Sequence, residues 1–265
     1  MLTLYHGSTS VCSQKVRVGL AELGLSYDSV VLDLQKGDQF DPDYRKLNPS
    51  AVVPTLVDDG LVVVESSLIL DYLDREMGAG QLSPKGDVAE VATAHWMLRT
   101  LDIHAAINTL SFSTAARDRI RAKKTPEQIA QDLERMPDPV SRMKRLSLLE
   151  DGLASVHVTQ ALLVLRRAFT DMQAVLEAHD WMMGAAFSKV DVALIAYIDR
   201  LDRLGFSGLW LSEFPAIDGW LRAMQSRQSY ATGIAAFADL VASETLRQSG
   251  ARYWPDLEER WLKLP

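Results

Sequence analysis

Cysteine and histidine are scarce in this sequence of 265 residues. The one cysteine, Cys12, excludes a disulfide framework within the chain and a Cys-x-x-Cys redox pair. The five histidines show no HExxH-type spacing, so we predict no metal site; they are His6, His95, His104, His157 and His179.

A basic excess and long apolar runs are also missing. The chain has 35 acidic and 28 basic residues, and its net charge of −7 argues against a nucleic-acid partner. No apolar stretch approaches the ~20 residues that cross a bilayer, and residues 1–6 lack the regions of a signal peptide. We therefore expect a cytoplasmic protein without a membrane or nucleic-acid partner.

The remaining composition is that of an ordinary globular protein, with 48% hydrophobic and 24% charged residues. Residue patterns in the first eighty positions alternate between strand and helix. We predict strands at 2–6, 27–32, 52–57 and 61–64, and helices at 11–23, 43–47 and 67–77, the last capped by Ser66. The first strand–helix–strand unit is expected to be a right-handed crossover between parallel strands.

Strand patterns stop after a loop at 79–87 that contains glycine and proline. Helices are predicted at 88–121, 156–179, 190–203, 216–227, 234–246 and 254–264. The chain is thus expected to form two domains, an α/β domain of order β-α-β-α-β-β-α at 1–80 and an all-helical domain at 88–265.

The stretch 117–145 is unusually basic, with nine basic against five acidic residues and the turn Met136-Pro-Asp-Pro139. Two hypotheses remain open for it. It forms a solvated connection between helices, or it presents a positive surface that steers an anionic ligand.

Four motifs, in this order and at these separations, carry a resemblance to a known family. They are Ser10-Val-Cys-Ser-Gln-Lys-Val-Arg17, Val53-Pro54, Glu65-Ser66 and Ser188-Lys-Val-Asp191. The sequence resembles the cytosolic glutathione transferases over essentially the whole chain, and the basic Pro-containing stretch is similar to one in the lignin β-etherase branch. The resemblance implies a thioredoxin-like N-terminal domain with a mixed sheet, an all-α C-terminal domain and glutathione as co-substrate, with no metal.

The predicted catalytic residues are Ser10, Cys12 and Ser13. A helix N-terminus offers free N–H groups and a positive dipole end, and a glutathione thiol bound there loses its proton more readily to become the nucleophile. The resemblance places a catalytic serine or cysteine at each of these positions in different classes. Simple helix capping by Ser10 and burial of Cys12 as a small apolar group stay open, and Tyr5 is expected to be a packing residue.

Five further residues are predicted to bind glutathione: Gln39, Val53, Pro54, Glu65 and Ser66. A cis Val53–Pro54 bond would leave the peptide groups of Val53 free to pair with the cysteinyl backbone, although a trans proline at a strand start is the alternative. The helix start at Glu65-Ser66 suits the γ-glutamyl carboxylate, or is an ordinary cap. Val52 offers no side-chain hydrogen bond, so Gln39, together with Lys36, is expected to meet the glycine end.

The resemblance places a hydrophobic electrophile between the two domains. Residues of the first long C-terminal helix that would line this substrate site are His104, Asn108, Ser111 and Phe112. By contrast, Ser188 and Asp191 form a capping box whose role is in folding.

The leading functional prediction is a glutathione S-transferase, with aryl-ether cleavage as its most specific form. The alternatives are a Cys12-dependent thiol–disulfide reductase and a non-catalytic ligand-binding protein of the same fold. A homodimer is expected, with Asp102 reaching the partner's site, because two helices carry apolar residues beyond the needs of one face; candidates are Ile69, Met77, Trp96, Met97 and Leu98.

Overall fold

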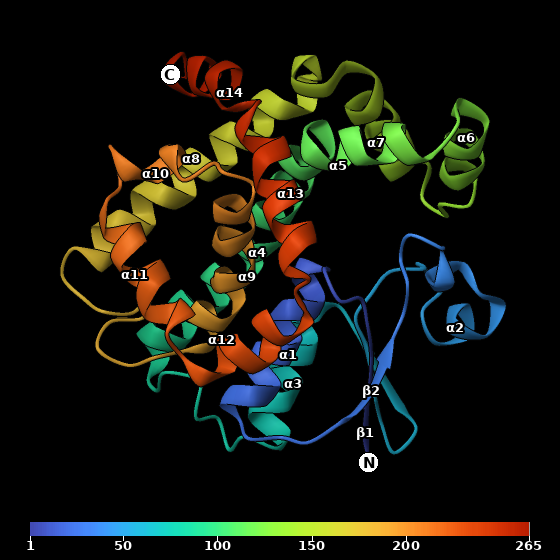
Figure 1. The fold of residues 1–265 in the computed structure, drawn as a ribbon. Helices are drawn as coiled ribbons and strands as arrows, with labels where there is room; N and C mark the ends of the chain where they lie inside the picture. The colour runs from blue at the N-terminus through green and yellow to red at the C-terminus, as the bar shows by residue number, and fades with distance from the viewer. Residues whose placement is uncertain (265) are drawn as a thin grey trace.

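The N-terminal part of the chain folds as an α/β unit (Figure 1). In a computed structural model of the protein, which describes residues 1–264, its elements are β1 (Leu2–His6), α1 (Val11–Glu22), β2 (Asp28–Val31), the 3-10 turn η1 (Asp38–Phe40), α2 (Pro42–Leu47), β3 (Thr55–Asp58), β4 (Leu61–Val64) and α3 (Ser66–Glu76). The predicted order of strands and helices is confirmed.

The four strands form one mixed sheet in the order β2-β1-β3-β4. β1 runs parallel to β2, with Tyr5 opposite Val30, and antiparallel to β3, with Tyr5 opposite Thr55. β3 and β4 form an antiparallel hairpin. Leu4, Leu56 and the inner faces of α1 and α3 pack into one apolar core. This packing fixes the positions at which α1 and β3 begin.

The C-terminal part is helical. Its helices are α4 (Asp87–Ser113), α5 (Ala115–Lys123), α6 (Pro126–Glu134), α7 (Pro139–Asp151), α8 (Val156–Leu176), α9 (Lys189–Arg203), α10 (Gly208–Leu211), α11 (Ala216–Gln225), α12 (Gln228–Gly233), α13 (Leu240–Ala251) and α14 (Trp254–Leu262), with 3-10 turns η2 (Gly152–Ala154) and η3 (Ala235–Phe237). α9 is buried on nearly every side, as expected of a helix at the centre of a bundle.

The predicted helix at 88–121 is wrong in one respect, because the helix is interrupted at Thr114, where φ is −130° and ψ is −117°. The Ser113 and Thr114 hydroxyls both donate to the Leu110 carbonyl, at 3.3 and 2.6 Å. Such side-chain bonds compete with the helical ladder, and the break turns α5 away from α4.

The helix predicted at 234–246 is also displaced. Ile234 follows the end of α12, and α13 begins only at Leu240, where the Asp239 carboxylate accepts the N–H of Ala242 at 2.9 Å. Asp239 is an ordinary N-cap signal, and it outweighs the apolar spacing that runs across it.

The segment between the two parts is held rather than loose. The Asp74 carboxylate accepts the Leu82 N–H at 2.9 Å and the Ser83 hydroxyl at 2.6 Å, and the Leu82 carbonyl accepts the N–H of Lys189 at 2.8 Å. α1 contacts α3 of the N-terminal part and both α9 and α12 of the C-terminal part. The start of α1 is therefore fixed against both parts of the molecule.

Within residues 1–264, no single helix is long and apolar enough to cross a membrane. One pair of segments, Pro139–Ala154 and Val156–Leu176, passes that test together by length and composition, but it is bent by 81°.

Candidate functional site

The loop after β1 presents the N-terminus of α1. Ser10 is the N-cap, and its hydroxyl accepts the N–H of Ser13 at 3.3 Å. The first N–H groups of a helix have no carbonyl one turn back, so those of Val11 and Cys12 are available to an anion. The predicted helix start with Ser10 as its cap is present, and binding of an anion there stays a prediction.

Ser13 occupies a different environment from Ser10. Its side chain is fully buried, and its hydroxyl accepts the N–H of Gly7 at 3.2 Å. This bond ties the loop to the first turn of α1, so Ser13 supports the loop from inside.

Cys12 lies at the point where the two parts of the molecule meet, and its side chain is partly exposed. Burial alone raises the pKa of its thiol, but hydrogen bonding to His104 and the charges of His104 and Lys15, with a hydrogen bond to Ser66, lower that pKa to about 7. Burial, together with the nearby Cys12 charge, raises the pKa of the Tyr197 hydroxyl well above its ordinary value. Cys12 is thus a partly ionised thiol at neutral pH.

Lys15 is a buried cation in this group. Its ammonium donates to the Ser67 hydroxyl at 2.9 Å and lies 5.3 Å from the centroid of the Tyr197 ring. The Ser67 and Thr100 hydroxyls are 3.0 Å apart. Burial lowers the pKa of Lys15 to about 8, although the nearby Cys12 and Glu65 charges raise it. Lys15 has no predicted role, and its one signal in the sequence is a lysine between apolar positions of α1.

The Val53–Pro54 peptide bond is cis, as predicted. The preceding carbonyl, that of Val52, accepts the Tyr44 hydroxyl and the Asn48 amide at 3.0 Å, which fixes the turn. Within residues 1–264 the peptide groups of Val53 make no backbone hydrogen bond. Because Thr55 pairs with Tyr5, the antiparallel register carries these free groups alongside the end of β1.

The start of α3 differs from the prediction. Ser66 is the first residue of the helix and not its cap, since Glu65 occupies the cap position with φ +67° and no capping side-chain bond. The Ser66 side chain is buried, whereas that of Glu65 is exposed. The hydrogen bond from Lys15 of α1 to Ser67, at 2.9 Å, places the start of α3 next to the first turns of α1.

Gln39 lies in η1, between β2 and α2, and is half-buried. Its Oε1 atom is buried and has no hydrogen-bond partner within residues 1–264, which is costly unless a ligand supplies one. Lys36 is exposed and pairs with Asp33 at 3.4 Å. Of the two residues predicted for the glycine end, Gln39 is thus the one with an unmet acceptor.

His104, Asn108 and Phe112 are half-buried and lie four residues apart on α4, so they share one face. The His104 ring is 5.9 Å from that of Tyr197. Arg145 of α7 covers the other two, 3.5 Å from the Asn108 amide oxygen and 3.3 Å from the centroid of the Phe112 ring. Burial lowers the pKa of Arg145 to about 10, so it still carries its charge at neutral pH.

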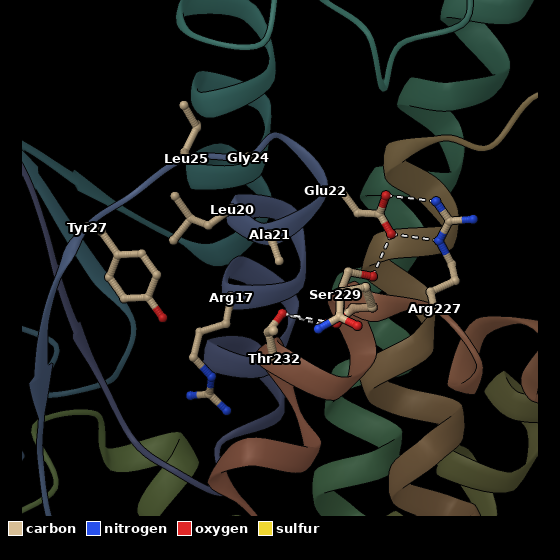
Figure 2. A pocket seen from close by; sticks show the side chains of 11 residues that line it. Arg17, Leu20, Ala21, Glu22, Gly24, Leu25, Tyr27, Arg227, Ser229 and Thr232 are labelled. Carbon is tan, nitrogen blue, oxygen red and sulfur yellow. Dashed lines mark hydrogen bonds and ion pairs between the residues drawn. The ribbon is translucent and has the colours of Figure 1, made fainter.

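A pocket of about 610 Å³ opens between α1, the segment before β2 and α12 (Figure 2). Figure 2 shows the Glu22 carboxylate bound to Arg227 and Ser229, at 2.6 and 2.5 Å. None of the predicted site residues lines this pocket in the described chain. A second pocket, of about 640 Å³, lies beneath η1 and α2 and is bordered by Tyr5, Tyr44 and Arg135.

In the part of the chain that the structure describes, no group of three or more His, Cys, Asp or Glu side chains is placed to hold a metal ion.

Two family descriptions match the chain. The glutathione S-transferase N-terminal domain matches residues 9–76, and the glutathione S-transferase C-terminal domain matches residues 146–223. Together with the four-stranded mixed sheet and the helical domain, these matches show that the chain belongs to the glutathione S-transferase superfamily.

Among sequence relatives, glutathione S-transferase Z1 of Arabidopsis thaliana is 43% identical over 84 residues, which are 32% of this chain and 38% of the relative. That likeness is thus confined to about a third of each protein. Tetrachloro-p-hydroquinone reductive dehalogenase of Sphingobium chlorophenolicum is 25% identical over 238 residues, 87% of this chain and 94% of that one.

Among solved structures, β-etherase LigF from Sphingobium sp. strain SYK-6 superposes with a TM-score of 0.78 at 21% identity, covering 89% of this chain and 99% of its own. A theta-class glutathione S-transferase from Xanthomonas axonopodis pv. citri, solved with glutathione bound, has a TM-score of 0.63 at 24% identity, covering 88% and 96%. At these identities the superpositions show a shared fold.

Proposed function

We propose that the protein is a glutathione transferase that activates the glutathione thiol at the N-terminus of α1. The observation that carries the proposal is that α1 and α3 meet near their N-termini, where Lys15 donates to Ser67 at 2.9 Å. The peptide groups of Val53 also make no backbone hydrogen bond within residues 1–264. Two positive helix ends suit the two anionic groups of one ligand, a thiolate and a carboxylate.

Each part of glutathione then has a partner of matching chemistry. The peptide groups of Val53 pair with the cysteinyl backbone as an added strand. The N–H groups at the start of α3 and the Ser66 hydroxyl bind the γ-glutamyl carboxylate, and the Glu65 carboxylate attracts its ammonium. Gln39 meets the glycine end.

The reaction follows from the thiolate. The Ser10 hydroxyl and the N–H groups of Val11 and Cys12 stabilise the sulfur anion, whose electron pair forms a bond to an electrophilic carbon while the leaving group departs with its own pair. His104, Asn108 and Phe112 border the position of the electrophile. The names of two relatives, a reductive dehalogenase and a β-etherase, favour an aromatic substrate that releases halide or phenolate.

Purified protein assayed with glutathione and a panel of aryl halides, epoxides, β-aryl ethers and disulfides tests this proposal. We expect a glutathione conjugate by mass spectrometry with at least one carbon electrophile. A protein that binds glutathione and such compounds but forms no product would instead be a ligand-binding member of the fold.

A second candidate function, thiol–disulfide exchange at Cys12, is favoured by the lowered pKa of that thiol and its partial exposure. The Cys12 thiolate would attack a glutathionyl disulfide and release the other thiolate. A second glutathione would then resolve the mixed disulfide and leave glutathione disulfide. Cys12→Ser should abolish disulfide reduction and spare the conjugation of carbon electrophiles, and loss of both would assign both to Cys12.

We also propose a homodimer, on a revised set of residues. Ile69 and Trp96 are buried within this chain, so those two are wrong as interface residues, because they pack into the protein's own core. Leu98 is 68% exposed, and further exposed apolar side chains on α3 and α4 are Leu68, Val88, Val91 and Leu101. Such a surface on two neighbouring helices is typical of a twofold interface.

A further inference from the structure

The basic stretch 117–145 forms α5, α6 and the start of α7, and α6 stands apart from the bundle of α4, α8 and α9 (Figure 1). α6 is well formed by itself: Thr125 and Gln128 make a capping box, and Pro126 opens the helix. Figure 1 shows α6 above the η1–α2 segment of the N-terminal part.

Arg135, at the end of α6, contacts the loop that leads into η1. Its Nη2 donates to the Gly37 carbonyl at 3.4 Å, and its guanidinium carbon lies 4.6 Å from the centroid of the Phe40 ring. Gly37 is buried with φ +89°, and a Cβ there would lie 2.9 Å from Arg135 Nη1. The positive φ therefore favours glycine here, and a larger residue would also displace the end of the Arg135 side chain.

Lys124, just before α6, makes a second contact with the same loop. Its ammonium is 3.5 Å from the Gln35 carbonyl and forms an ion pair with Asp132 of α6. Arg135 and Lys124 thus bind carbonyls two residues apart from the two ends of one helix. Two such contacts restrain the orientation of the loop as well as its position.

The loop is also ordered from within. The Asp33 carboxylate accepts the N–H groups of Gln35 and Lys36, at 2.9 and 3.3 Å, and the Asp38 carboxylate accepts the N–H of Asp33 at 2.8 Å. Gln39 follows directly and carries the buried Oε1 atom that has no partner in the described chain. The internal hydrogen bonds of the segment thus hold Gln39 in place, and its amide oxygen has no hydrogen-bond partner in the described chain.

We propose that Arg135 and Lys124 are positioning residues for the glycine end of glutathione, holding the 35–40 loop so that the Gln39 amide binds there. This inference rests on the proposed function. The amide matches that end of the ligand, since its oxygen accepts the glycyl N–H and its nitrogen donates to the glycine carboxylate. Residues of the C-terminal part of the chain thereby position a glutathione-binding residue of the N-terminal part.

The competing explanation is that the stretch attracts anions through its net positive charge. A ligand pair separates the two. γ-Glutamylcysteine lacks the glycine but has the same net charge as glutathione at neutral pH, so steering affects both ligands equally. Positioning of Gln39 affects only glutathione.

Titration calorimetry of the full-length protein with each ligand tests the proposal, using Arg135→Ala and Lys124→Ala. Matched controls are Arg121→Ala and Lys123→Ala, exposed residues of α5. We expect Arg135→Ala to weaken glutathione binding roughly fivefold, the effect of about one hydrogen bond, and to leave γ-glutamylcysteine binding unchanged. Lys124→Ala should act in the same direction and more weakly, and the controls should leave both ligands unaffected.

Arg135→Met keeps the apolar stem over Phe40 and serves if the alanine variant does not fold, and Arg135→Lys should restore part of the glutathione affinity. Equal weakening for both ligands, or no change for either, would overturn the positioning role. A wild-type protein that prefers neither ligand would do the same. If the wild type binds neither ligand, the proposed function fails as well. That result comes from the wild type alone, so it is distinguishable from a failure of the positioning role, which the variants reveal.

Discussion

At the scale of single residues, Arg17 is a cation almost completely removed from solvent, with 1% of its surface exposed. It donates to the carbonyls of Gly7, Ser8 and Gly233 at 3.1, 2.9 and 2.7 Å, and it lies 4.0 Å from the Phe237 ring centroid. Because a guanidinium holds several donors in a fixed plane, Arg17 fixes the loop before α1 to the end of α12. Because Ser10 follows this loop directly, Arg17 also holds the candidate anion site in place.

His6 responds to the same cation. The Arg17 guanidinium donates to His6 Nδ1 at 3.0 Å, so the Nε2–H of the neutral ring donates to Ser29 Oγ at 2.7 Å. Burial and the Arg17 charge lower the pKa of His6 to about 4, against about 6.5 when unfolded. As the pH falls from about 6.5 to about 4, His6 binds a proton in the unfolded chain but stays neutral in the folded chain.

We therefore predict that the free energy of unfolding drops by up to about 3 kcal/mol across this pH window through His6. Urea denaturation at several pH values measures it. In His6→Gln the drop should be smaller by that amount, while the exposed His179→Gln should behave as wild type. Identical pH profiles for wild type and His6→Gln would contradict the account.

Cys12 yields a second residue-scale prediction. With its pKa lowered to about 7, the rate of alkylation by iodoacetamide should rise with pH through a midpoint near that value, because the thiolate is the reactive form. His104→Ala removes the first of the groups that lower the pKa, so its midpoint should move toward the ordinary thiol range of about 8.5. His95→Ala, on the exposed side of the same helix, should leave it unchanged. A wild-type midpoint in the ordinary range would refute the interaction with His104.

At the scale of elements, the start of α9 shows how one side chain organises a bundle. Asp191 completes the predicted capping box with Ser188, and its buried carboxylate also accepts the N–H groups of Met182 and of the Trp220 indole, both at 2.9 Å. The box therefore links the loop before α9 to α11 as well as capping its own helix.

Asp191→Ala should cost about 3 kcal/mol, since it leaves several buried donors without an acceptor. The exposed cap of α13 is the matched control, and Asp239→Ala should cost about 1 kcal/mol. Denaturant unfolding compares the two. Equal losses would mean that Asp191 acts only as a cap, and glutathione affinity of the folded Asp191→Ala variant should stay normal.

The elements themselves were predictable where local signals agree. The strand–helix–strand unit, the Asp58-Asp59-Gly60 hairpin turn and the α9 capping box each depend on neighbouring residues, and each is present. The break at Thr114 was not predictable in this way, because apolar spacing continues through Ser113 and Thr114. It arises from two hydroxyl groups competing for one carbonyl.

At the scale of the whole molecule, the candidate site is a product of the contact between the two parts. The sequence motifs predicted the helix ends at Ser10 and Ser66 and the cis turn. The contacts of Cys12 with His104, Lys15 with Ser67 and Arg135 with Gly37 join residues that are far apart in the chain. No local pattern encodes such pairs, since they depend on how the helical part packs against α1 and η1.

The exposed apolar surface of α3 and α4 gives a whole-molecule prediction. Light scattering at micromolar concentration should give a mass near twice the 29.4 kDa of the chain. Leu98→Glu places a charge in that surface and should shift the mass toward one chain. The exposed Val241→Glu of α13 is the control. A wild-type mass near that of one chain would contradict the dimer.

If the start of α1 converts bound glutathione to its thiolate, ultraviolet titration of the bound thiol will show a lowered pKa. The measurement uses Cys12→Ser protein, so that the Cys12 thiol does not contribute. We predict that bound glutathione titrates at least about one pH unit below the free thiol, whose pKa is about 8.5. Adding Ser10→Ala should move the midpoint back upward, since one hydrogen bond to a charged group is lost. A bound thiol that titrates where the free thiol does would contradict the account.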